Sequence, residues 1–195
     1  MAGCLVLGSM AAPAEAQRRA LGLVMGVVES TQTRARQPDS EVHSGLMVGA
    51  WVDQQTPLPW LSVTAEAFLV RRGARYILDD GFARQLDVDY VGAALLPSLR
   101  ASAGPASLVG YAGPALDFHL RSQSSVELQG IFLQAAGQTF AGVVGGAVEF
   151  MTERTTFRFD ARLHQQLSRA FEGEVSDAKH RSVEFLFRLG MRRRP

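Results

Sequence analysis

Apolar and polar residues alternate along most of the chain, most clearly in the segment TTFRFDARLHQQL at residues 155–167. Because successive side chains of a β-strand point to opposite faces, this period of two predicts a strand with one apolar and one ionic face. The apolar face holds Phe157, Phe159, Ala161 and Leu163, and the ionic face holds Arg158, Asp160, Arg162 and His164. A soluble sheet would bury the apolar face, whereas a membrane barrel would turn that face to lipid and the ions inward.

The same period of two recurs in eight segments, so the chain is predicted to be all-β. The candidate strands are residues 18–30, 42–53, 60–72, 87–99, 107–120, 139–151, 154–168 and 181–192. Each is about 12–15 residues long, whereas strands of globular proteins are usually about 5–6 residues long. A tilted strand that crosses a bilayer needs about 9–11 residues. Strand length therefore favours a membrane barrel.

The connections between these segments alternate between long and short. The long ones are 31–41, 73–86, 121–138 and 169–180, and the short ones are 54–59, 100–106 and 152–153. In an up-and-down barrel, this alternation places all long loops at one end and all short turns at the other. The segment 121–138 could contain a brief helix or extend the two flanking strands.

We therefore predict an eight-stranded antiparallel up-and-down transmembrane β-barrel, with long loops outside and both termini in the periplasm. The ionic face is expected to line the lumen with a structural set of charges: Arg158, Asp160, Arg162, His164, Glu66, Glu184 and Arg188. The apolar face is expected to meet lipid through Phe157, Phe159, Leu163, Val183, Phe185, Phe187 and Leu189. Because eight strands enclose just enough room for side chains, we expect paired charges to plug the lumen. The alternatives are a narrow channel and a barrel that binds a ligand or lipid.

Two tryptophans, Trp51 and Trp60, flank the short connection at 54–59. Amphipathic rings form aromatic girdles where a membrane barrel meets the two interfaces, so both are predicted to be interface aromatics. The alternative is that the two rings simply cover the turn.

The N-terminal segment CLVLGSMAAPAEAQRR has an apolar run followed by Ala14-Glu15-Ala16, which is typical of an export signal and its cleavage site. We expect a signal peptide at residues 1–16, with the start placed too far downstream, and a barrel domain at 17–195. A lipid-modified Cys4 and a disordered apolar tail are the alternatives. Cleavage would remove the one cysteine, and the mature chain would then tolerate an oxidising compartment.

Composition and candidate chemistry narrow the function classes. The net charge of +1 gives no field that would attract nucleic acid, and no stretch approaches the roughly 18 apolar residues of a membrane helix. Some small membrane barrels modify lipids with a His and a Ser, but in regular strands His43–Ser44 and His119–Ser122 would each point to opposite faces. His164 and His180 add no such pair, and the four His show no metal-ligand spacing. We therefore predict no enzymatic activity, cofactor or metal; a lipid-modifying barrel enzyme and a soluble lipocalin-like binder are alternatives.

Seven segments, in order along the chain, resemble those of one family. They are SGLMVGAWVD, LSVTAEAFLVRRGAR, DYVGAALLPSL, GYAGPALDFHL with its Gly113-Pro114, FAGVVGGAVEF, FDARLHQQLSRAF and RSVEFLFRLGMR, and together they cover about residues 18–192. They resemble the PorT-like outer-membrane β-barrel proteins, which share the shape of the OmpA and OmpX barrels. This chain ends MRRRP, where the family commonly ends its closing strand on an aromatic residue, and it lacks the family's mid-strand Pro near Ala93.

The resemblance implies a location and a role. The location is the outer membrane of a Gram-negative-type bacterium, and the role is structural or interaction-based. The implied partners are outer-membrane lipids, the barrel-assembly machinery, and periplasmic or surface proteins.

Overall fold

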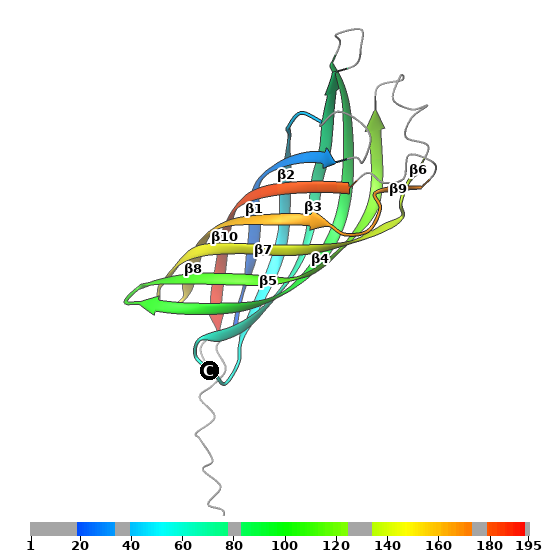
Figure 1. Ribbon diagram of the computed structural model, residues 1–195. Helices are drawn as coiled ribbons and strands as arrows, with labels where there is room; N and C mark the ends of the chain where they lie inside the picture. The colour runs from blue at the N-terminus through cyan, green and yellow to red at the C-terminus, as the bar shows by residue number, and fades with distance from the viewer. Residues whose placement is uncertain (1–18, 34–39, 78–82, 125–133, 173–178, 194–195) are drawn as a thin grey trace, which may run out of the picture.

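The computed structural model describes residues 19–33, 40–77, 83–124, 134–172 and 179–193, and it forms one closed antiparallel barrel (Figure 1). The barrel strands are β1 (Arg19–Thr33), β2 (His43–Gln55), β3 (Leu61–Ile77), β4 (Ala83–Ala103), β5 (Ala106–Ser124), β7 (Gln138–Met151), β8 (Thr155–Gln166) and β10 (Lys179–Arg193). Around the barrel their order is β1-β10-β8-β7-β5-β4-β3-β2, so β10 closes the ring against β1. Two short strands, β6 (Gln134–Ala135) and β9 (Phe171–Glu172), form a separate pair. The predicted eight-stranded up-and-down barrel is confirmed.

The short turns lie at the same end of the barrel as the start of β1 and the end of β10. Gly104 and Pro105 alone join β4 to β5, and Gly104 has a φ of 63°, a left-handed conformation that glycine adopts without a steric penalty. Arg19 pairs with Arg193, so β1 begins where β10 ends. Figure 1 marks the C-terminus at this short-turn end.

At the opposite, long-loop end, β3 and β4 continue past their predicted limits. Residues 73–77 pair with residues 83–87, which leaves only 78–82 as the connection. The predicted long loop at 73–86 is therefore wrong. The two strands were predicted to end at residue 72 and to begin at residue 87, but the alternation continues into the hairpin, where Ala74 and Leu86 are buried while Arg75 and Gln85 are exposed.

β5 also continues in this direction, to Ser124, so the alternative in which residues 121–138 extend a flanking strand holds for 121–124. Residues 125–133, where a brief helix was the other alternative, lie outside the described residues. The predicted signal peptide at 1–16 also lies outside them, and it stays a prediction together with the 17–195 domain boundary. Within the described ranges, no helix is long and apolar enough to span a membrane.

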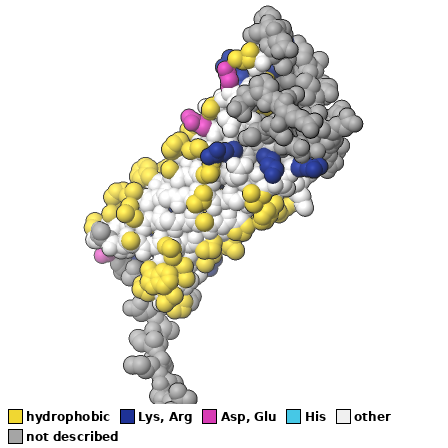
Figure 2. All heavy atoms as spheres, viewed as in Figure 1, with side chains coloured by type: hydrophobic (Ala, Val, Ile, Leu, Met, Phe, Trp, Pro, Cys, Tyr) yellow, Lys and Arg dark blue, Asp and Glu magenta, His cyan; other side chains and the backbone are white. Residues whose placement is uncertain are grey.

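The distribution of side chains is inverted relative to a soluble protein. On β1, Leu21, Leu23 and Met25 all point outward and are more than half exposed. Figure 2 shows hydrophobic side chains spread over the barrel wall, with charged side chains gathered toward the long-loop end. Inside, Arg158 and Arg188 are among the largest fully buried side chains. The strands therefore present their apolar face outward.

The interior combines apolar and charged side chains. β1 and β4 contribute buried apolar side chains, among them Val24, Val28, Leu86 and Leu96. β3, β8 and β10 contribute most of the buried charges. Packing is also close where β7 meets β8: a Cβ built at Gly145 would lie 2.6 Å from the Cβ of Arg162, its direct partner in the register, so this position needs a small residue.

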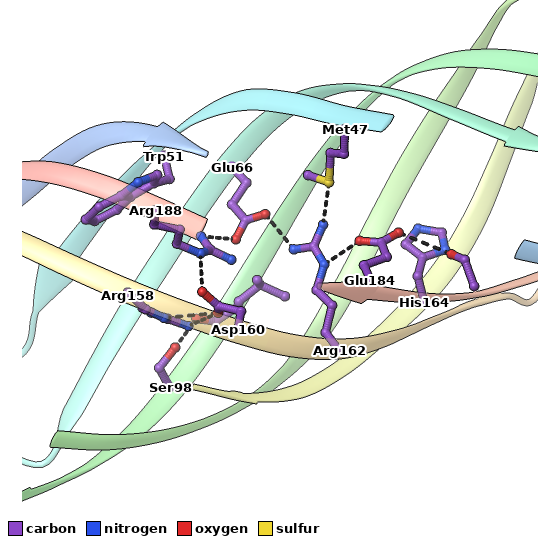
Figure 3. Close-up of polar contacts among 12 residues, drawn as sticks. Met47, Trp51, Glu66, Ser98, Arg158, Asp160, Arg162, His164, Glu184 and Arg188 are labelled. Atoms are coloured by element: carbon purple, nitrogen blue, oxygen red, sulfur yellow. Dashed lines mark hydrogen bonds and ion pairs between the residues drawn. The ribbon is translucent and has the colours of Figure 1, made fainter. Parts of the chain in front are cut away.

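The two tryptophans lie in different environments. Trp51 is 4% exposed, its Nε1 donates to the Leu23 carbonyl oxygen at 3.1 Å, and its ring lies against Gly190 inside the barrel (Figure 3). The prediction of Trp51 as an interface aromatic is wrong, because Trp51 is opposite the inward Glu66 in the strand register. Trp60 is 50% exposed and immediately precedes β3, as an interface aromatic would.

Candidate functional site

A continuous series of ion pairs runs through the lumen, and Figure 3 shows the part of it from Glu184 to Arg158. From the long-loop end it comprises Asp117, Arg72, Glu184, Arg162, Glu66, Arg188, Asp160 and Arg158, which we call the ion-pair chain. Between neighbours, N to O distances are 2.6–2.9 Å, and the Arg188–Glu66 pair completes the series. Four guanidinium groups alternate with four carboxylates, so the formal charge of the chain is zero.

Two adjacent strands, β8 and β10, position five of the eight members of the ion-pair chain. Arg158, Asp160 and Arg162 follow one another at every second residue of β8, which places all three on the inward face. On β10, Arg188 is directly opposite Arg158, and two like charges at such a position repel. Asp160 lies between them: its Oδ1 accepts from Arg158 Nε at 3.0 Å and its Oδ2 from Arg188 Nε at 2.9 Å.

The centre of the chain is Arg162, whose guanidinium is fully buried. Its Nη1 donates to Glu66 at 2.7 Å and its Nε to Glu184 at 2.6 Å. Its Nη2 lies 3.2 Å from the Met47 sulfur, and its Cζ lies 5.8 Å from the centre of the Phe68 ring. Removing such a group from water is costly unless nearly every donor finds a partner. The surrounding side chains provide these partners.

At the short-turn end, the lumen holds a second cluster of charges. Arg100 contacts Asp53 at 3.5 Å and Glu149 at 3.1 Å, and the Thr64 hydroxyl donates to Asp53 at 2.7 Å. A hollow beside this cluster has a volume of about 20 Å³, roughly the space of one water molecule. Arg158 links the two clusters, since it is directly opposite Glu149 in the register of β7 and β8.

At the long-loop end, imidazole and phenol groups follow the ion-pair chain. His164 Nε2 lies 3.2 Å from Asp117 Oδ2. The Tyr90 ring is in edge contact with His119 and with His180, at centroid distances of 6.3 and 6.2 Å. The lumen is therefore lined with polar groups from one end to the other.

All seven residues predicted to line the lumen are buried inside the barrel, and six of them belong to the ion-pair chain. The seventh, His164, contacts its first member. Sequence reasoning missed Arg72 and Asp117. The signal was present, because Arg72 continues the inward series of Glu66 on β3, but the predicted strand ended at that residue.

No protein-family model and no curated protein sequence matches this chain. Among solved structures, the outer membrane protein OprG from Pseudomonas aeruginosa has a TM-score of 0.62 at 10% identity, covering 92% of this chain and 97% of that chain. Neisserial surface protein A (NspA) has a TM-score of 0.52 at 9% identity, covering 87% and 97%. The chain has the fold of a small outer-membrane β-barrel. The resemblance to the PorT-like family stays a prediction, because no family model matches.

The outer face of this outer-membrane barrel fold carries the residues predicted to meet lipid. Phe157, Phe159, Val183, Phe185 and Leu189 are 38–56% exposed, and Leu163 and Phe187 are partly buried by their neighbours. The Phe159 and Phe187 rings pack against each other across β8 and β10, with centroids 5.2 Å apart. These seven side chains form one apolar surface, opposite the charged face of the same strands.

One pair of residues departs from the sequence reasoning. His119 and Ser122 were expected on opposite faces of β5, but His119 Nε2 and Ser122 Oγ are 2.7 Å apart. A β-bulge causes this contact: Asp89 is opposite Arg121 while Tyr90 is opposite His119, so one residue of β5 is left over. The extra residue restores both side chains to the same face.

The remaining candidates do not form a nucleophile–base pair. His43 Nε2 contacts Asp87 Oδ1 at 2.8 Å, while Ser44 is exposed on the outer face. Within the described part of the chain, no group of three or more His, Cys, Asp or Glu side chains could hold a metal ion. The carboxylates of the ion-pair chain are instead paired with arginines.

Proposed function

We propose that this protein is a non-conducting outer-membrane β-barrel of a Gram-negative-type bacterium, with a structural or interaction role and its long loops facing outward. The carrying observation is the inverted arrangement: a buried, charge-balanced ion-pair chain inside a wall of exposed apolar side chains. A closed barrel satisfies its backbone groups between strands, so lipid can surround it.

The inverted arrangement disfavours a soluble lipocalin-like binder. Such a barrel would expose Leu23, Phe159 and Phe185 to water while placing charges in its ligand cavity. Bilayer hydrocarbon accommodates this apolar surface without that cost. In the proposed membrane orientation, the β3–β4 hairpin and the long loops would face outside, where they could meet surface partners.

The filled lumen favours a plug over a channel. Eight strands enclose just enough space for side chains, and the ion-pair chain crosses the middle of that space. Moving one member would leave an opposite buried charge unpaired, which costs several kcal/mol. The proposal includes export by the predicted signal at 1–16 and insertion by the barrel-assembly machinery.

Two measurements test this function. The protein is expected in the outer-membrane fraction, with heat-modifiable migration on a detergent gel, and a soluble periplasmic product would refute the membrane location. In a planar bilayer, the reconstituted barrel is expected to give no conductance above background. Discrete conductance steps would refute the plug and leave the membrane location standing.

The contact between His119 and Ser122 favours a second candidate, a lipid-modifying barrel enzyme. Against it, no carboxylate among the described residues hydrogen-bonds the other His119 ring nitrogen, so the base lacks an orienting partner. Release of fatty acid from outer-membrane lipid by the purified barrel, abolished in Ser122→Ala and retained in Ser44→Ala, would establish the enzyme. Equal background release by all three proteins would exclude it.

A further inference from the structure

A groove of about 720 Å³ opens on the outer face of β1–β5 toward the long-loop end. Its walls are the outward apolar side chains Val27, Leu46, Val48, Leu69 and Leu120. The groove is also lined by Ser44, Arg71 and Asp89. These polar residues lie at the end of the groove that is nearer the long loops. The groove is therefore apolar over most of its length and polar at the end nearer the long loops.

The β-bulge of β5 contributes to both parts of this groove. Because Tyr90 is opposite His119 and Asp89 is opposite Arg121, Leu120 is the extra residue between them. Leu120 and Arg121 consequently both point outward, although they are adjacent in sequence. A regular strand would have turned one of them into the lumen. The bulge thus adds an apolar wall residue and a cation at the same place.

The polar end carries two exposed guanidinium groups, those of Arg71 and Arg121. Arg71 Nε and Nη2 donate to the two Asp89 carboxylate oxygens at 2.8 and 3.1 Å, which fixes the plane of the guanidinium. Arg121 is exposed and directly opposite Asp89 in the register. Asp87 also interacts electrostatically with Arg71, so the two arginines and the two carboxylates balance in formal charge, but Asp87 is held by His43 Nε2 at 2.8 Å. The Arg71 side chain is still 49% exposed, so it can accept a further anion.

We propose that this groove binds a phosphate-bearing lipid of the outer leaflet. The phosphate lies against Arg71 and Arg121, because guanidinium groups match phosphate oxygens in charge and hydrogen-bond geometry. One acyl chain lies between Leu46, Leu69 and Leu120, continuous with the apolar belt. The inference rests on the proposed membrane orientation, which puts the polar end at the headgroups of the outer leaflet.

Native mass spectrometry of the detergent-solubilised protein tests this site with two lipids, dioleoyl phosphatidic acid and dioleoyl phosphatidylcholine. The wild-type barrel is expected to prefer phosphatidic acid. The double variant Arg71→Gln/Arg121→Gln should weaken phosphatidic acid binding by roughly fivefold for each arginine removed. The matched control Arg75→Gln/Arg181→Gln removes two exposed cations outside the groove and should leave the preference unchanged.

Three outcomes would overturn the proposal. They are a wild-type barrel without preference, equal losses in the two double variants, and displacement of phosphatidic acid by inorganic phosphate at equal concentration. The last outcome would assign the cations to free phosphate. Each variant is first checked for heat-modifiable migration, because all four substitutions lie on exposed positions and should leave the barrel intact. A wild-type protein without that migration would instead refute the membrane barrel itself.

Discussion

The two faces of β8 and β10 obey different rules, although they share one backbone. Inward, Arg162 has charged partners on two other strands, and both of these contacts depend on direction and charge. Outward, Phe185 and Phe159 need only be apolar, because lipid adapts to their shape. The comparison indicates that the contacts in the lumen determine which structure forms, whereas the outward apolar side chains, which we call the apolar belt, determine that this structure can lie in a membrane.

The largest effect is expected where an inward charge loses its partners. Glu184→Leu removes the acceptor of both Arg72 and Arg162 and leaves the ion-pair chain with an uncompensated positive charge. Breaking a buried ion pair on one side costs about 3–5 kcal/mol, so the free energy of unfolding should fall by that amount. Urea unfolding of the refolded barrel in lipid vesicles, followed by tryptophan fluorescence, measures it.

The control for this change is the neighbouring outward residue. Val183→Ile keeps an apolar side chain at a position that is 41% exposed, so it should shift the free energy of unfolding by less than about 0.5 kcal/mol. If Glu184→Leu were as mild as Val183→Ile, the ion-pair chain would contribute little, and the contrast between the two faces would fail.

The next largest effect is expected where the belt receives a charge. Phe185 lies in the middle of β10 and is 53% exposed, so Phe185→Arg should place a guanidinium near the middle of the hydrocarbon. The expected cost is about 2–4 kcal/mol, because the charge loses its hydration. Phe185→Leu, which stays apolar, should cost much less in the same vesicle assay. Equal stability of the two variants would show that this face does not meet lipid.

Much of this fold could be predicted because period-two alternation reports strand faces directly. The alternation of Phe157 and Arg158 with their neighbours indicated which side chains face the lumen. It was misleading in β2, where Met47 and Trp51 point inward while Leu46 and Val48 point outward. Because β2 has apolar residues on both faces, its sequence does not indicate which face points inward. Trp51 was therefore predicted to be an interface aromatic from its position near a turn.

The partners of the charges could not be predicted in the same way. Arg72 and Glu184 are 112 residues apart, and Arg162 and Glu66 are 96 apart, so their contact depends on the register of several strands. The bulge at Leu120 was also hidden, because it shifts the phase of alternation without changing composition. Local pattern therefore indicates the face of a residue, while closure of the barrel selects its partner.

The smallest effect is expected from adding a methyl group at two adjacent glycines of β7, Gly145 on the inward face and Gly146 on the outward face. A Cβ built at the inward Gly145 would lie 2.6 Å from the Arg162 Cβ, whereas one at the outward Gly146 has its nearest neighbour, the Val109 carbonyl oxygen, at 3.8 Å. Gly145→Ala should therefore cost about 1–3 kcal/mol by overpacking. Gly146→Ala should be neutral or stabilise by up to about 1 kcal/mol, since alanine loses less backbone entropy on folding than glycine.

Both glycine variants are compared in the vesicle unfolding assay. Each adds one methyl group to the same strand, so a difference in stability reports the face alone. Gly146 also lines an outer hollow of about 800 Å³, which has room for the added methyl group. Equal destabilisation would mean that backbone conformation, rather than packing around Arg162, requires glycine here. A loss confined to Gly145→Ala would show that the lumen is packed tightly enough to register one methyl group, as a plug requires and an open channel does not.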